Sequence, residues 1–210
     1  MFPTQMPRAL LLALVLPLLS GCSALSALGD ATQPLDVYEL QPPAEVPVAR
    51  RSQARDVIVE LPTTSGALET DRIMIRPDRL AATYLPGVRW GEPAPVMVQT
   101  VLLRTLDATG AFQYVGRRPL GPSGDYAIVT ELVEFEAEVL EDGDSARIDI
   151  RLTSRIVRED GVRIVAARTF TSTATAASLD DTALVEAFDA AMGPLARDFA
   201  GWVLATLGAG

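Results

Sequence analysis

The chain has 210 residues, of which 18 are basic and 27 acidic, and its formal net charge is −9. It contains no histidine and no lysine, so every basic residue is an arginine. These absences exclude a serine or cysteine nucleophile with a histidine base, a lysine Schiff base and a phosphate-binding loop with its lysine, and they disfavour a zinc site. A chain this acidic is also not expected to bind nucleic acid.

The N-terminal segment is typical of a bacterial signal peptide. Arg8 is its only charged residue, and the apolar stretch over residues 9–19 is shorter than the roughly 20 residues that a membrane-spanning helix needs. The motif Leu19-Ser20-Gly21-Cys22 resembles the lipobox of bacterial lipoproteins, in which a peptidase cuts before a cysteine that carries diacylglycerol. We therefore expect residues 1–21 to be removed and Cys22 to become the lipidated N-terminus.

Cys22 is the only cysteine of the chain. The alternative, an ordinary cleavage site with Cys22 as a bystander, would leave a free thiol in an oxidising compartment, where it is a liability. In Gram-negative lipoproteins the next residue biases sorting, and Ser23 in place of aspartate implies the inner leaflet of the outer membrane. Residues 22–34 are predicted to form a tether that reaches about 40 Å when extended. A domain over residues 35–210 would then hang in the periplasm from acyl chains.

Short strands and one helix are predicted in the first half of the domain. Strands are expected over residues 35–40, 56–61, 72–76, 80–85 and 112–115, with a proline-rich arm over residues 41–53. A helix is expected over residues 92–107, because Pro93 suits a first helical turn, where its missing N–H costs little, and Gly110 follows the end of the helix.

Two turn signals predict an antiparallel meander near the end of the chain. The pair Asp142-Gly143 separates two alternating runs and is typical of a two-residue type I′ hairpin. With this turn, the residue numbers of any two cross-strand partners sum to 285. On one face, Val133, Phe135 and Ala137 are then opposite Leu152, Ile150 and Ile148. On the other face, Glu134 and Glu138 are opposite Arg151 and Arg147. A slip of one residue would expose the whole apolar set. Asp160-Gly161 repeats the signal and adds a strand over residues 162–173.

A second helix is predicted to begin at Ser178, whose spacing to Asp181 resembles a capping box. Apolar residues recur at helical spacing along it: Leu184, Phe188, Met192, Leu195, Phe199, Trp202 and Val203. Gly193 and Pro194 interrupt this stripe and are expected to kink or split the helix. The predicted fold class is α+β, a single domain in which two helices pack on one face of an antiparallel sheet.

Two groups of carboxylates are the candidates for chemistry. Glu134, Glu136 and Glu138 alternate on a predicted strand and could serve a glycosidase-type hydrolase, but the hairpin register sets arginines opposite two of the three. The turn residues Glu141, Asp142 and Asp144 lack the spacing of a calcium-binding loop and are better explained as a solvated turn. We therefore predict a protein that is not an enzyme, with no catalytic residue, no cofactor and no metal.

Several short motifs resemble one family, the ABC-type transport auxiliary lipoproteins. The matching motifs are Tyr38-Glu39-Leu40, Arg72-Ile73-Met74-Ile75-Arg76, Tyr84-Leu85-Pro86-Gly87, Arg89-Trp90 with Glu92-Pro93, Leu132-Val133-Glu134-Phe135, Phe170, Ala187-Phe188 with Ala190-Ala191, and Trp202. This resemblance implies a partner system, because members accompany Mce-type ABC transporters that move phospholipids or other hydrophobic molecules between the two membranes of Gram-negative bacteria. The implied partners are an Mce-domain periplasmic protein with its permease and ATPase, and further copies of the chain in a homo-oligomeric ring.

Four residues are candidate contacts for a partner or a lipid: Arg72, Arg76, Tyr84 and Trp90. Trp90 precedes the first predicted helix and could anchor an interface, or it could fill the base of the core under that helix. Arginines at strand ends could contact an acidic partner, or could simply be solvated. A competing function, from another class, is a structural lipoprotein that stabilises an outer-membrane assembly without handling lipid.

Overall fold

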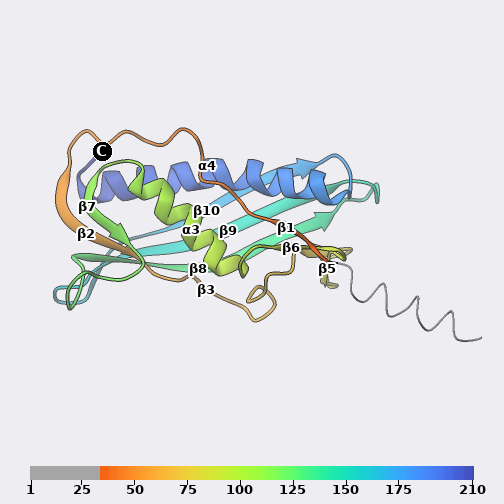
Figure 1. Cartoon of the computed structure of the whole chain (residues 1–210), viewed down its shortest axis with the longest axis horizontal. Coiled ribbons are helices and arrows are strands. Elements are labelled where there is room, and N and C mark those ends of the chain that lie inside the picture. Colours follow the sequence, from red (N-terminus) through yellow and green to blue (C-terminus); the bar gives the residue numbers. More distant parts are fainter. Residues whose placement is uncertain (1–33) are drawn as a thin grey trace, which may run out of the picture. The chain divides into compact units, whose positions relative to one another are not determined.

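The computed structural model describes residues 34–210. The predicted signal peptide, the predicted lipidation site Cys22 and most of the predicted tether lie outside the described residues. Residues Asp36–Gly210 form one compact unit. Its core is a continuous cluster of buried apolar side chains from the helices and strands. Figure 1 shows how these elements are arranged.

The described chain contains long C-terminal strands, shorter N-terminal strands and helices α3 and α4. The strands are β1 (Asp36–Tyr38), β2 (Gln53–Val59), β3 (Thr63–Thr64), β4 (Met74–Arg76), β5 (Thr83–Tyr84), β6 (Val88–Trp90), β7 (Phe112–Gly116), β8 (Tyr126–Val139), β9 (Ala146–Arg158) and β10 (Arg163–Ala176); the helices are α3 (Ala94–Asp107) and α4 (Asp181–Leu207). The expected strands are present with shifted bounds, and β3 and β6 are additional strands that the sequence did not predict.

The main sheet is mixed, which corrects the prediction of an antiparallel sheet. The order is β10-β9-β8-β2-β7, and the meander of β8, β9 and β10 is antiparallel as predicted. However, β2 runs parallel to both β7 and β8, and β3 and β4 also pair in parallel with β8. The chain between β2 and β7 contains α3, and a helical crossover of this kind returns a strand in the same direction.

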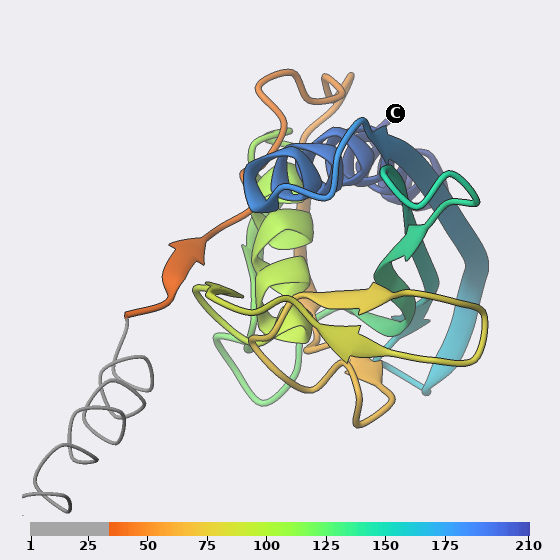
Figure 2. The same ribbon diagram turned by 90° about the vertical axis from the view of Figure 1, so that its right-hand side faces the viewer.

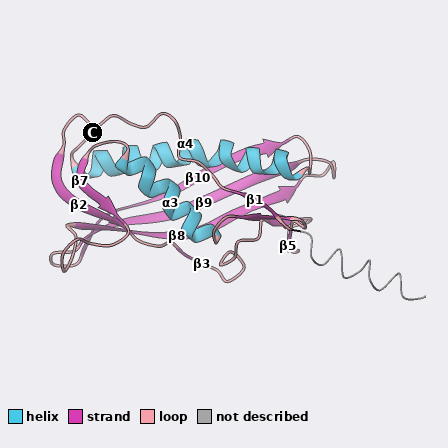
Figure 3. Ribbon diagram, in the orientation of Figure 1, coloured by secondary structure: helices cyan, strands magenta, loops and turns pink. Residues whose placement is uncertain are grey.

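Both helices pack against the same side of the sheet. Helix α4 contacts β9 and β10, α3 contacts β2 and β7, and the two helices contact each other. Figure 2 shows the sheet curling around them, and Figure 3 shows α4 lying along the long strands. Within the described residues, no helix has the length and apolar character needed to cross a membrane.

The predicted register of the first hairpin is confirmed from Glu134 onwards. Glu134 pairs with Arg151, Phe135 with Ile150 and Ala137 with Ile148. A register shift follows between Glu134 and Leu132, so that Leu132, instead of Val133, faces Leu152. Val133 is therefore the extra residue of a β-bulge and is 38% exposed. The bulge keeps Leu132 on the buried face.

The turn of this hairpin is wider than predicted. Leu140 N–H donates to the Ser145 carbonyl at 2.9 Å, which leaves four residues in the loop instead of two. Gly143 has a φ of 75°, the left-handed conformation that glycine adopts without strain. The side chain of Asp142 accepts the backbone N–H groups of Asp144 and Ser145 at 3.0 Å each. Because the loop is centred on the predicted turn, the strand register is unchanged.

Helix α4 is continuous, which corrects the expected break. It begins at Asp181 with Asp180 as N-cap and without a side-chain cap, so Ser178 does not form a capping box and instead donates to Asp180 Oδ2 at 2.7 Å. Pro194 lies inside the helix. The buried residues Met192 and Leu195 on either side of it stay packed on the sheet, and such packing usually outweighs the loss of one helical hydrogen bond.

Two aromatic clusters lie in the core. Trp90, Phe135 and Phe188 form the first, with ring centroids 5.0 to 5.8 Å apart. Phe170, Phe199 and Trp202 form the second. Phe199 is fully buried and Trp202 is partly buried, so both belong to the core, in agreement with their helical spacing.

Candidate functional sites

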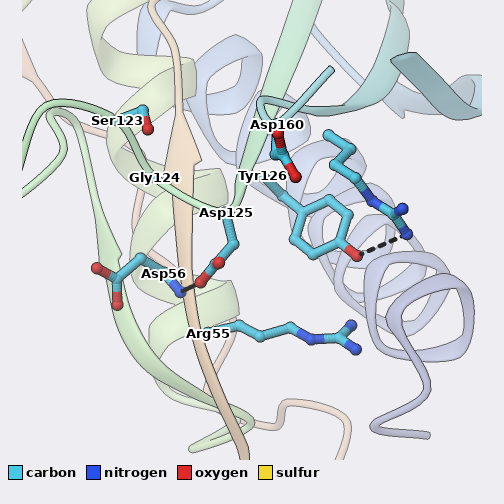
Figure 4. A pocket seen from close by; sticks show the side chains of 8 residues that line it. Arg55, Asp56, Ser123, Gly124, Asp125, Tyr126 and Asp160 are labelled. Carbon is cyan, nitrogen blue, oxygen red and sulfur yellow. Dashed lines mark hydrogen bonds between the residues drawn. The ribbon is translucent and has the colours of Figure 1, made fainter. Parts of the chain in front are cut away.

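A hollow of about 450 Å³ lies where the start of β2, the loop before β8 and the β9–β10 turn meet (Figure 4). Its lining residues are Arg55, Asp56, Ser123, Gly124, Asp125, Tyr126, Arg158 and Asp160. They come from three segments that lie far apart in the sequence. Apart from the Asp160-Gly161 turn signal, these segments carry no recognisable motif, so the sequence does not predict this hollow.

Three of the charged side chains of this hollow, those of Arg55, Asp125 and Arg158, bind other parts of the chain. Asp125 Oδ2 accepts the backbone N–H of Asp56 at 2.8 Å and so joins β8 to β2 (Figure 4). The guanidinium carbons of Arg55 and Arg158 lie 5.4 and 5.9 Å from the ring centroid of Tyr126, within the range of cation–π attraction. Arg55 also donates to the carbonyl of Leu207 at the end of α4, at 3.1 Å. We assign the hollow a structural role.

The alternating glutamates of β8 are ion-paired on the outer face of the sheet. Glu134 pairs with Arg151 and Glu138 with Arg147, as the hairpin register predicts. Glu136 pairs with Arg76 on the neighbouring strand β4, with 2.5 Å between Oε1 and Nε. A general acid needs a carboxyl group that can exchange a proton with a substrate. Three carboxylates held beside arginines weaken the hydrolase hypothesis.

The Glu136 carboxylate accepts a hydrogen bond from the guanidinium of Arg76, and this bond raises the pKa of Arg76 above its usual value. The Arg76 side chain is 30% exposed and that of Glu136 is 14% exposed. The candidate contact residue Arg76 is thus already engaged with an acid of its own chain.

Replacing Arg76 by glutamine is expected to lower the free energy of unfolding by about 0.5 to 1 kcal/mol, because partly exposed ion pairs contribute about this much. The loss should disappear in a Glu136→Gln background, since the partner is then neutral. Urea unfolding of the single and double variants measures this coupling. Arg79→Gln, which removes a charge at the same surface but no ion pair within residues 34–210, should change stability less.

The remaining candidate contact residues lie on or beside the β4–β5 pair. Arg72 donates to the carbonyl of Leu85 at 2.9 Å, and the Tyr84 hydroxyl donates to the carbonyl of Ala67 at 2.9 Å. Tyr84 is 37% exposed, so part of its ring stays available to a partner. Trp90 is 1% exposed. A partner or lipid cannot reach its indole ring in this structure. Trp90 is a core residue, which is the second of the two roles that its sequence position allowed.

The acidic turn between β8 and β9 is organised by its own hydrogen bonds. The Ser145 hydroxyl donates to Asp142 Oδ2 at 2.6 Å. This bond and the two backbone bonds to Asp142 hold the pKa of its carboxyl group below the usual value. Across residues 34–210, no group of three or more acidic, histidine or cysteine side chains is arranged to hold a metal ion. Asp142 thus acts as a turn-stabilising residue.

Comparison with known sequences identifies one family. A sequence model described as the ABC-type transport auxiliary lipoprotein component matches residues 38–200. An uncharacterised protein of Bradyrhizobium diazoefficiens is 26% identical over 194 residues, which cover 89% of this chain and 49% of that protein. The chain therefore spans about half the length of this relative.

Comparison with solved structures identifies the same fold. Protein XCC0632 from Xanthomonas campestris is 23% identical, with a TM-score of 0.75 over 82% of this chain and 96% of that chain. A second crystal structure, of an uncharacterised protein, is 13% identical, with a TM-score of 0.62 over 81% of this chain and 99% of that chain. At these identities the likeness concerns the fold alone.

Proposed function

Because the family match covers residues 38–200, this chain belongs to the ABC-type transport auxiliary lipoprotein family, and we propose that it is the outer-membrane component of an Mce-type ABC transporter. In this role the protein catalyses no reaction. It docks the periplasmic Mce assembly and helps to pass phospholipid or another hydrophobic molecule between the inner and outer membranes. The family match is the observation that carries this proposal.

The described residues support a non-catalytic role. In the hollow around Tyr126, Asp125 and Arg55 bind the backbone, and along β8 the three glutamates form ion pairs with arginines. Binding and docking need no reactive group, so this arrangement is compatible with a tethering protein. The proposed anchor is a set of acyl chains on Cys22, which would hold the domain on the periplasmic face of the outer membrane.

A ring of copies is part of the proposal. Within the described residues, β10 and β7 each pair with a strand on one side only. Open strand edges present unpaired N–H and C=O groups that can pair with another chain. Strand β10 has 14 residues, which makes it the longer of the two edges and the better candidate for contact between neighbouring copies.

The proposal is tested by a crosslinking pulldown of the lipidated protein from its native membrane, with partners identified by mass spectrometry. We expect recovery of an Mce-domain protein with its permease or ATPase, and crosslinked multimers of this chain. The control is the Cys22→Ala variant, which should lose its acyl mass and its outer-membrane fractionation. Repeated recovery of an outer-membrane barrel alone would contradict the transporter role and favour a structural lipoprotein.

A further inference from the structure

Three arginines lie around an open groove that is separate from the hollow and from the glutamates of β8. The groove has a volume of about 620 Å³ and lies where α3 meets β7 and the loop that follows it. Its lining residues are Thr100, Leu103, Arg104, Tyr114, Arg117 and Arg118. We call it the α3–β7 groove.

The three arginines carry charge that the described chain does not neutralise. Among residues 34–210, none of Arg104, Arg117 and Arg118 forms an ion pair, whereas Arg76, Arg147 and Arg151 do. Most arginines of residues 34–210 form no ion pair, so what distinguishes these three is that they gather in one groove. No carboxylate lines the groove. The nearest one in its hydrogen-bond network is Glu92, whose Oε2 lies 3.4 Å from Thr100 Oγ1.

The groove is held in shape by contacts that involve its own side chains. The Tyr114 hydroxyl donates to the carbonyl of Arg118 at 2.9 Å, which fixes the loop after β7. Arg117 Nη2 lies 2.5 Å from Thr100 Oγ1 and so connects that loop to α3. A Cβ at Gly116 would lie 2.1 Å from the Tyr114 hydroxyl oxygen, so only glycine leaves room for this ring. The Arg117 guanidinium is therefore held in place before any ligand arrives, and Arg104 and Arg118 line the groove beside it.

The groove also has an apolar side. Leu103 is partly buried and packs against the core, and the Tyr114 ring is partly buried beside Gly116. Arginine binds phosphate oxygens in a bidentate geometry, and an apolar wall next to such a cluster can cover a hydrocarbon group. Free phosphate or a sugar phosphate would leave Leu103 and Tyr114 uncovered. The ligand that matches both sides is an amphiphile with a phosphate group.

We propose that the α3–β7 groove binds the phosphate headgroup of a phospholipid, with Arg104, Arg117 and Arg118 around the phosphate. The glycerol and the first methylene groups would lie on Leu103 and Tyr114. This inference rests on the proposed lipid-transport function and adds a lipid-contact site on the auxiliary protein itself.

Native mass spectrometry of the full chain, purified from membranes in a neutral detergent, tests the site with dihexanoyl phosphatidylglycerol as the probe. We expect a lipid adduct with the wild type. In the Arg104→Gln/Arg117→Gln variant binding should be about tenfold weaker, because two charge-assisted contacts are lost. Glu92→Gln should bind about twofold more tightly, because it removes a nearby negative charge.

The matched control is Arg155→Gln/Arg163→Gln, which removes the same charge from β9 and β10 and should leave the affinity unchanged. Melting temperatures check that all variants fold. Equal binding by the wild type and by Arg104→Gln/Arg117→Gln would overturn the site. Equal binding of glycerol phosphate or inorganic phosphate would overturn the lipid assignment.

The partner pulldown distinguishes this inference from the function on which it rests. If the wild type recovers the Mce protein but forms no lipid adduct, the groove inference is wrong and the proposed function stands. If Arg104→Gln/Arg117→Gln loses the Mce protein and the wild type forms no lipid adduct, the groove instead binds an acidic protein segment. If lipid binds at the groove and no transporter component is recovered, the proposed function is the one that fails.

Discussion

Replacing Trp90 by alanine is expected to lower the free energy of unfolding by about 3 to 5 kcal/mol, the usual cost of removing a large buried aromatic side chain. Trp90 is 1% exposed, and its ring centroid lies 5.8 Å from that of Phe135 and 5.3 Å from that of Phe188. These rings join β6, β8 and α4. Because β6 also pairs with β1, the cavity should loosen the first strand of the domain as well.

Urea unfolding followed by circular dichroism measures this effect, since the chain has only two tryptophans and fluorescence would lose one of its reporters. Trp90→Phe should cost less than half as much as Trp90→Ala, because a benzyl group refills most of the space. Trp202→Ala is the comparison, and it should cost less because Trp202 is only partly buried. Unchanged stability of Trp90→Ala together with loss of partner recovery would show that Trp90 contacts a partner in another conformation.

The meander could be predicted from the sequence because its information is local. Asp142-Gly143 defines the turn, and the alternation of Phe135 and Ala137 with charged residues defines the buried face. One register satisfies the apolar pairs and the pairing of Glu138 with Arg147, and the structure has this register. A change of turn length from two residues to four, centred on the same position, left it intact.

The parallel strands could not be predicted in this way. Val57 pairs with Tyr126 and Ile75 with Ala137, and nothing near either residue in the sequence specifies a partner so far along the chain. The bulge at Val133 also depends on contacts between distant parts of the sequence, because the strand must shift there to keep Leu132 buried beneath the helices. Helix α4 does not split at Pro194, because the local cost of the proline is outweighed by the packing of the flanking residues Met192 and Leu195.

The surfaces that bear on function depend on tertiary structure to an even greater extent. Arg104 comes from α3 and Arg117 from the loop after β7, and the packing of α3 against β7 brings them to one groove. A run of two arginines followed by proline reads as an ordinary solvated loop. The lack of acidic residues in residues 108–119 does not single this loop out, because residues 161–179 contain none either.

Two buried hydroxyl groups lie within hydrogen-bond distance on the inner face of the sheet. Thr130 and Ser154 are cross-strand partners on β8 and β9, they are 1% and 0% exposed, and their oxygens lie 2.9 Å apart. Ser154→Ala should cost about 1 to 3 kcal/mol, because it leaves the Thr130 hydroxyl buried without this partner. Thr130→Val should cost a similar amount. The double variant should be within about 1 kcal/mol of the wild type, since no buried hydroxyl is then left unpaired.

Urea unfolding of the four proteins measures the coupling between the two positions. The pair Thr153 and Thr169 supplies a control on the outer face, where the two oxygens lie 3.1 Å apart and are exposed. Water replaces a missing partner there, so its coupling should be close to zero. If the losses at Thr130 and Ser154 were simply additive, the two hydroxyl groups would each have another partner in the folded protein. Strong coupling would instead show that β8 and β9 hold their register in the core through polar pairing as well as apolar packing.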